Sequence, residues 1–188
     1  MILRSALCPA VLTLLSVLAL SPPAARAEDL WSVSLYGGPT TDTFTSRIVT
    51  GHLHLIGGMA GVAVNRKIAY LGSGFTLSAE GQVTQYLTHD PYQTVSLGLG
   101  LSFDRFPWDT PTTVSLHLGP SYAFDPPPVS GERHPFLNYV SAEFAVQIPP
   151  MENWDAVLRL FHRSGAWGLY AVQVDQGTMV GAGIRVRF

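Results

Sequence analysis

The chain has 188 residues, of which 13% are charged, and its mean hydropathy is +0.23. Its 11 Lys and Arg residues stand against 13 Asp and Glu residues without any basic block, so nucleic acid is not an expected partner. Cys8 is the single cysteine and lies near the start of the chain, which argues against disulfide or thiol chemistry in the mature protein.

Residues 1–27 are typical of a secretory signal peptide. Arg4 provides a positive start, Val11–Leu20 is a short apolar run, and Ala25–Ala27 fits the rule of small residues around a cleavage site. We therefore expect one mature domain over residues 28–188, exported from the cytoplasm. Without the two arginines of the signal segment, nine basic residues remain against 13 acidic ones, a net charge of about −4.

The mature segment alternates repeatedly between apolar and polar residues, as strands with two different faces do. Eight stretches are predicted to be strands: Trp31–Tyr36, His52–Asn65, Phe75–Thr88, Thr94–Phe103, Thr113–Leu118, Leu137–Ile148, Trp154–Ser164 and Thr178–Phe188. No mature stretch contains about 18 consecutive apolar residues, the length that a spanning helix needs. High hydrophobicity without such a helix predicts an all-β fold, an eight-stranded antiparallel outer-membrane β-barrel.

An even number of strands lets both termini of the chain lie on the periplasmic side. The segments 67–74, 105–111 and 149–153 are then predicted to be periplasmic turns. The outward loops are predicted at 38–51, 89–93, 124–136 and 165–177. A ring of eight strands leaves an interior that side chains fill, so a wide pore is not expected.

A soluble β-sandwich or lipocalin-like barrel is the structural alternative. It would have to place four arginines in its core, because Arg159, Arg163, Arg185 and Arg187 lie opposite the apolar face of their strands. A narrow polar lumen can hold them, with carboxylates such as Glu80 and Glu143 as partners. An aromatic last residue and aromatic residues near predicted strand ends also favour the membrane barrel.

The predicted strand Trp154–Ser164 carries the most informative pattern. Its apolar face continues from Leu158 and Leu160 into His162 and Ser164, so a histidine and a serine are predicted on the lipid side near the outer rim. Same-face neighbours on a strand are about 7 Å apart at Cα. An imidazole that accepts the proton of a serine hydroxyl makes that serine a nucleophile, so the pair suggests ester hydrolysis. The alternative is a polar strand end that only meets lipid headgroups.

A His-x-Ser pair on the lipid face of the penultimate strand of an eight-stranded barrel resembles the outer-membrane lipid A 3-O-deacylase (PagL-type) family. The resemblance is specific over about the last 35 residues and implies Ser164 as nucleophile, His162 as general base and no cofactor or metal. The family has Asn after the serine, where this chain has Gly165. The family's glutamate falls at Gln176, and Asp175 beside it is the other candidate for orienting the imidazole.

The resemblance implies a lipid A acyl-ester hydrolase of the cell outer membrane, a membrane-embedded protein whose partner is lipopolysaccharide in the outer leaflet. The main alternative is a non-enzymatic small barrel that acts through its loops in envelope integrity or adhesion. A small pore is a third possibility. The sequence leaves open which acyl chain is cut and whether the barrel forms a homodimer.

Overall fold

The computed structural model describes residues 30–41, 54–129, 131–166 and 175–188, with the side chain of Asp175 left out. The predicted signal peptide, His52 and parts of the predicted loops 38–51 and 165–177 lie outside this part of the chain. Within it, eight antiparallel strands form one closed barrel in chain order, which confirms the predicted fold. They are β1 Trp31–Thr41, β2 Leu55–Gly72, β3 Phe75–Thr88, β4 Tyr92–Phe103, β5 Thr112–Phe124, β6 Phe136–Ile148, β7 Met151–Ser164 and β8 Asp175–Arg187.

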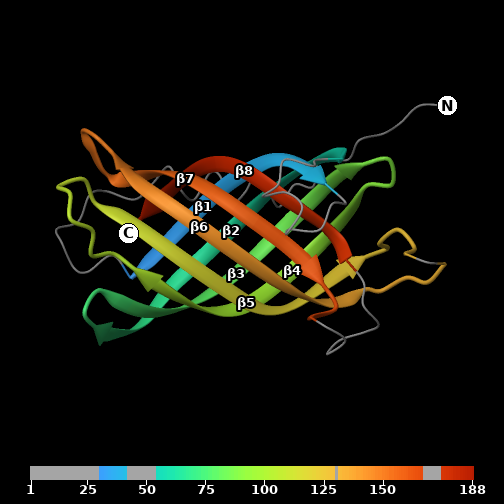
Figure 1. Cartoon of the computed structure of the whole chain (residues 1–188), viewed down its shortest axis with the longest axis horizontal. Helices are drawn as coiled ribbons and strands as arrows, with labels where there is room; N and C mark the ends of the chain where they lie inside the picture. Colours follow the sequence, from blue (N-terminus) through green and yellow to red (C-terminus); the bar gives the residue numbers. More distant parts are fainter. Residues whose placement is uncertain (1–29, 42–53, 130, 167–174) are drawn as a thin grey trace.

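The strands are tilted against the long axis of the barrel, and β1 pairs with β8 to close the ring (Figure 1). Backbone bonds join Trp31 and Phe188, so the first and last strands meet at the same end of the barrel. The connections β2–β3, β4–β5 and β6–β7 lie at this end as well (Figure 1). By the rule for this class of barrel, this end faces the periplasm.

The predicted periplasmic turn at 67–74 is wrong for most of its length. β2 continues to Gly72, and Gly72 pairs with Phe75, the first residue of β3. The turn needs only Ser73 and Gly74, both with positive φ, a conformation that two-residue hairpin turns favour. β1 and β5 also extend beyond their predicted ends, to Thr41 and Phe124, because both neighbours in a closed ring offer backbone partners.

The outer wall of the barrel is apolar. Its exposed large side chains include Leu35, Val83, Val95, Leu97, Leu99, Leu101, Leu116, Leu118, Leu158 and Ile184. Every strand has at least 11 residues, enough for a tilted strand to cross the hydrocarbon core. Such an apolar outer wall is stable only in contact with lipid.

In the described residues, no helix is long and apolar enough to cross a membrane.

Replacing Leu97 with Arg tests this wall, because its side chain is 63% exposed near the middle of β4. We expect the change to lower the free energy of unfolding in a bilayer by about 2–4 kcal/mol, the cost of an arginine at mid-depth. Phe124→Arg at the end of β5 is the depth control and should cost below about 1 kcal/mol. Urea titration of barrels in vesicles measures both. Equal effects would contradict this placement of the wall.

Charged side chains fill the middle of the barrel. Arg159 is 1% exposed and donates to Glu80 and, at 2.9 Å, to Glu143, while its guanidinium lies 4.6 Å from the centre of the Tyr36 ring. Arg185 bonds to Glu143 at 3.0 Å and to Asp155 at 2.7 Å. The predicted pairing of interior arginines with Glu80 and Glu143 is confirmed for Arg159 and Arg185.

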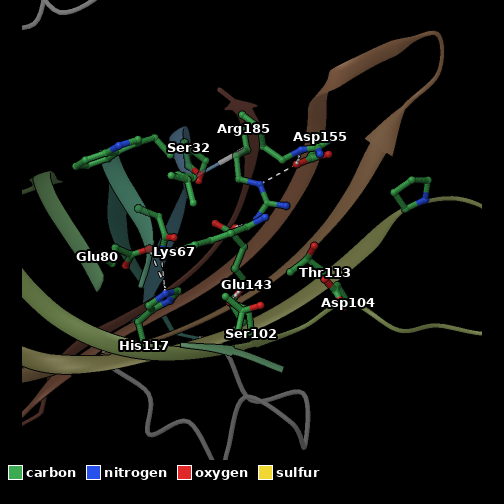
Figure 2. Close-up of a pocket in the computed structure, with 18 of the residues that line it drawn as sticks. Ser32, Lys67, Glu80, Ser102, Asp104, Thr113, His117, Glu143, Asp155 and Arg185 are labelled. Atoms are coloured by element: carbon green, nitrogen blue, oxygen red, sulfur yellow. Dashed lines mark hydrogen bonds and ion pairs between the residues drawn. The ribbon is translucent and has the colours of Figure 1, made fainter. Parts of the chain in front are cut away.

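A cavity of about 230 Å³ lies inside the barrel at the periplasmic end. Figure 2 shows Glu80 and His117 on one side of it and Arg185 with Asp155 on the other. His117 lies within hydrogen-bonding distance of Asn65 and Ser78. Because the charged groups of Arg185, Asp155 and Glu80 are paired with one another or with Glu143 and Arg159, the cavity is part of the structural interior.

Candidate active site

The outer face of β7 changes from apolar to polar as the strand approaches its end. Arg159, Phe161 and Arg163 are buried inside the barrel, so the alternating positions face outward. There Leu158 is exposed, and Leu160, His162 and Ser164 are half-buried. The structure therefore places His162 and Ser164 on the outer wall, at the end of the barrel opposite Trp31 and Phe188.

The His162 ring is held from the neighbouring strand β8. Its Nδ1 atom lies 2.9 Å from Oγ1 of Thr178, and the two residues are direct cross-strand partners. A threonine hydroxyl can accept the Nδ1 proton, and in that tautomer Nε2 keeps its lone pair. This is the arrangement that a general base requires, since an acceptor at Nδ1 fixes both ring and tautomer. Thr178 is fully buried, which limits competition from water.

Gln176 occupies a different place from the one predicted. The pairing of β7 with β8 is irregular between His162 and Ser164, and Gly177 has a φ of 104°. A bulge of this kind changes the face on which the next side chain lies. The Gln176 side chain is consequently inside the barrel and accepts a hydrogen bond from Arg163. In the structure, the Gln176 carboxamide thus contacts Arg163 inside the barrel, whereas the His162 ring lies on the outer wall.

The backbone of Asp175 is the cross-strand partner of Ser164. The irregularity in the pairing thus brings Asp175 beside the serine, while Thr178 is beside the histidine. The side chain of Asp175 lies outside the described part of the structure, so its orienting role stays a prediction. Sequence reasoning missed Thr178, because the alternation within a strand does not reveal which residue of the neighbouring strand lies opposite it.

Arg163 supports the site from inside the barrel. Its guanidinium lies 3.1 Å from Oγ of Ser121 on β5 and 2.5 Å from the carbonyl oxygen of Pro135, just before β6. With the bond to Gln176, this one side chain connects β5, β7, β8 and the start of β6. Because it stands between His162 and Ser164 in the sequence, it limits movement of the backbone that carries them.

Within the described ranges, no three His, Cys, Asp or Glu side chains gather closely enough to hold a metal ion. The side chains placed here include a serine hydroxyl, an imidazole and a threonine hydroxyl within hydrogen-bonding distance of the imidazole. Such a set can form and break an acyl ester.

No family model matches the chain, and no curated protein matches it significantly. Among solved structures, the fold is similar to the outer membrane enzyme PagL, with a TM-score of 0.60 and 10% identity over 84% of this chain and 99% of that chain. It is also similar to Neisserial surface protein A, with a TM-score of 0.54 and 13% identity over 84% of this chain and 97% of that chain. At these identities the likeness concerns the fold, and this chain is a small outer-membrane β-barrel with eight strands.

Proposed function

We propose that this barrel is an acyl-ester hydrolase of the outer membrane that removes an acyl chain from lipid A in the outer leaflet. The observation that carries the proposal is the hydrogen bond between His162 Nδ1 and Thr178 Oγ1. His162 stands two residues before Ser164 on the same outer face of β7. A ring held by an acceptor at Nδ1 beside a serine is the constellation of a serine hydrolase.

The position of the pair supports a lipid substrate. His162 and Ser164 interrupt an apolar wall next to Leu160, at the end of the barrel away from Trp31 and Phe188. Polar groups on a lipid-facing wall are costly unless they have partners, so packing alone does not favour them there. In a Gram-negative outer membrane, the lipid at this level is lipopolysaccharide, whose acyl esters lie just below the headgroup.

In the proposed reaction, Ser164 Oγ attacks the ester carbonyl while His162 Nε2 accepts the serine proton. The carbonyl electron pair moves onto oxygen, and the tetrahedral intermediate collapses as the bond to the sugar oxygen breaks. His162 returns the proton to that oxygen. Water then attacks the acyl-serine, His162 accepts its proton and returns it to Ser164, and the free fatty acid leaves.

Expression of the full chain in the outer membrane of a Gram-negative host tests the proposal. We expect mass spectra of extracted lipid A to show loss of one hydroxyacyl chain relative to the empty vector. The refolded barrel should release the same fatty acid from purified lipid A. Unchanged lipid A in both assays, with a barrel that migrates as folded on unheated gels, would overturn the proposal and favour a non-enzymatic barrel in envelope integrity or adhesion.

Thr178→Val should lower kcat by about 10- to 100-fold and leave KM unchanged. Valine has nearly the same shape but cannot accept the Nδ1 proton, and an unmade hydrogen bond of 1–3 kcal/mol corresponds to a loss of this size. Asp175→Asn is the matched comparison, because it changes the other candidate for orienting the ring. Fatty-acid release by the refolded variants measures both. A larger loss in Asp175→Asn than in Thr178→Val would assign the orienting role to Asp175.

A further inference from the structure

Asn138 on β6 is the neighbour of Ser164 across the strand pair. It shares the outer face of β6 with Val140, Ala142 and the exposed Phe144, while Leu137 and Tyr139 are buried inside. On its other side, Asn138 pairs with the exposed Pro120 of β5. Directly paired residues have Cβ atoms about 4.5–5.5 Å apart. The carboxamide therefore lies within reach of a group bound to Ser164 Oγ.

The carboxamide of Asn138 is recessed in the wall and has unused hydrogen-bonding capacity. The residue is 9% exposed, and within the described ranges no side chain or backbone group forms a hydrogen bond with its amide. Lipid cannot supply a hydrogen-bond partner to a carboxamide on the outer wall. An apolar residue would suit this position better if only the fold mattered.

Acyl transfer creates a need for such a donor. When Ser164 attacks an ester, the carbonyl electron pair becomes an oxyanion that requires hydrogen-bond donors fixed in advance. The residue after the serine is Gly165, which has no side chain to donate. A recessed amide beside Ser164 is well placed because hydrogen bonds are stronger where water is excluded.

Building on the proposed function, we infer that Asn138 Nδ2–H donates to the oxyanion of the tetrahedral intermediate on Ser164, and that Asn138 is thus a catalytic residue. The donor lies on the β6 side of the serine, whereas Thr178 holds the histidine from the β8 side. The scissile carbonyl oxygen consequently points toward β6 during the attack. When the intermediate collapses, the electron pair returns to the carbon and the bond to the sugar oxygen breaks.

Steady-state hydrolysis of lipid A by refolded variants tests the inference. Asn138→Leu suits a lipid-facing wall and should fold, and Asn138→Asp keeps the shape but replaces the donor with a negative charge. Both should lower kcat by about 10²- to 10³-fold with KM nearly unchanged, the effect of removing one oxyanion donor. Gln93→Ala, which removes an exposed carboxamide from the outer wall at the start of β4, is the matched control and should retain full activity.

The outcomes separate this inference from the proposed function. If wild type is active and Ser164→Ala is inactive, but both Asn138 variants keep kcat within about threefold of wild type, the role of Asn138 is overturned and the hydrolase stands. A rise in KM with unchanged kcat would likewise overturn it, since binding alone would then be affected. An inactive wild-type barrel that is folded would overturn both.

Discussion

Replacing Ser164 with Ala is expected to lower lipid A hydrolysis by about 10⁴-fold or more, because the variant has no atom that can form the acyl-enzyme. The barrel itself should remain folded, since Ser164 is the last residue of β7 and half-buried on the outer wall. Fatty-acid release by the refolded protein and mass spectra of lipid A from cells measure the effect. Heat-modifiable migration on gels verifies the fold.

His162→Gln should cause a loss of similar size, and the double variant should be little slower than either single one, because nucleophile and base act as a unit. Thr88→Ala removes a hydroxyl from the same end of the barrel, where it bonds to the Asp90 carbonyl at 2.8 Å. This control should keep wild-type activity. Full activity of Ser164→Ala would show that another group is the nucleophile.

Replacing Arg159 with Met is expected to lower the free energy of unfolding by about 3–5 kcal/mol, the usual effect of removing one partner from a buried ion pair. The guanidinium is the shared partner of Glu80 and Glu143. Arg185 still holds Glu143 at 3.0 Å in the variant, whereas Glu80 loses its arginine. Urea titration of the barrel in vesicles, followed by tryptophan fluorescence, measures the change.

Adding Glu80→Gln to Arg159→Met should recover part of the lost stability, because the carboxylate left without its arginine is then neutral. Arg133→Ala is the matched arginine control. Its ion pair with Asp125 is formed by exposed side chains, so its loss should change stability by less than about 1 kcal/mol. Equal effects of Arg159→Met and Arg133→Ala would contradict a structural role for the interior network.

The barrel can be predicted from the strand pattern of the sequence alone. Alternation in segments such as Thr94–Phe103 has a period of two, so each strand has one apolar and one polar face. Other strands carry arginines on the polar face. This pattern predicts a lipid-facing apolar wall around a polar interior. The same alternation placed His162 and Ser164 on the outer face. It could not locate the turn at Ser73 and Gly74, because Lys67–Gly72 has no clear alternation yet still pairs with β3.

The side chains that surround the serine and the histidine could be identified only in the folded barrel. Periodicity fixes the face of a residue within its own strand, but cross-strand neighbours depend on register, and a single bulge changes both register and face. The regular register of β7 with β8 places Thr178 beside the His162 ring, and the irregularity that follows near Gly177 sends Gln176 inside to Arg163. The pairing of β6 with β7 likewise places Asn138, 26 positions before Ser164 in the sequence, directly beside it.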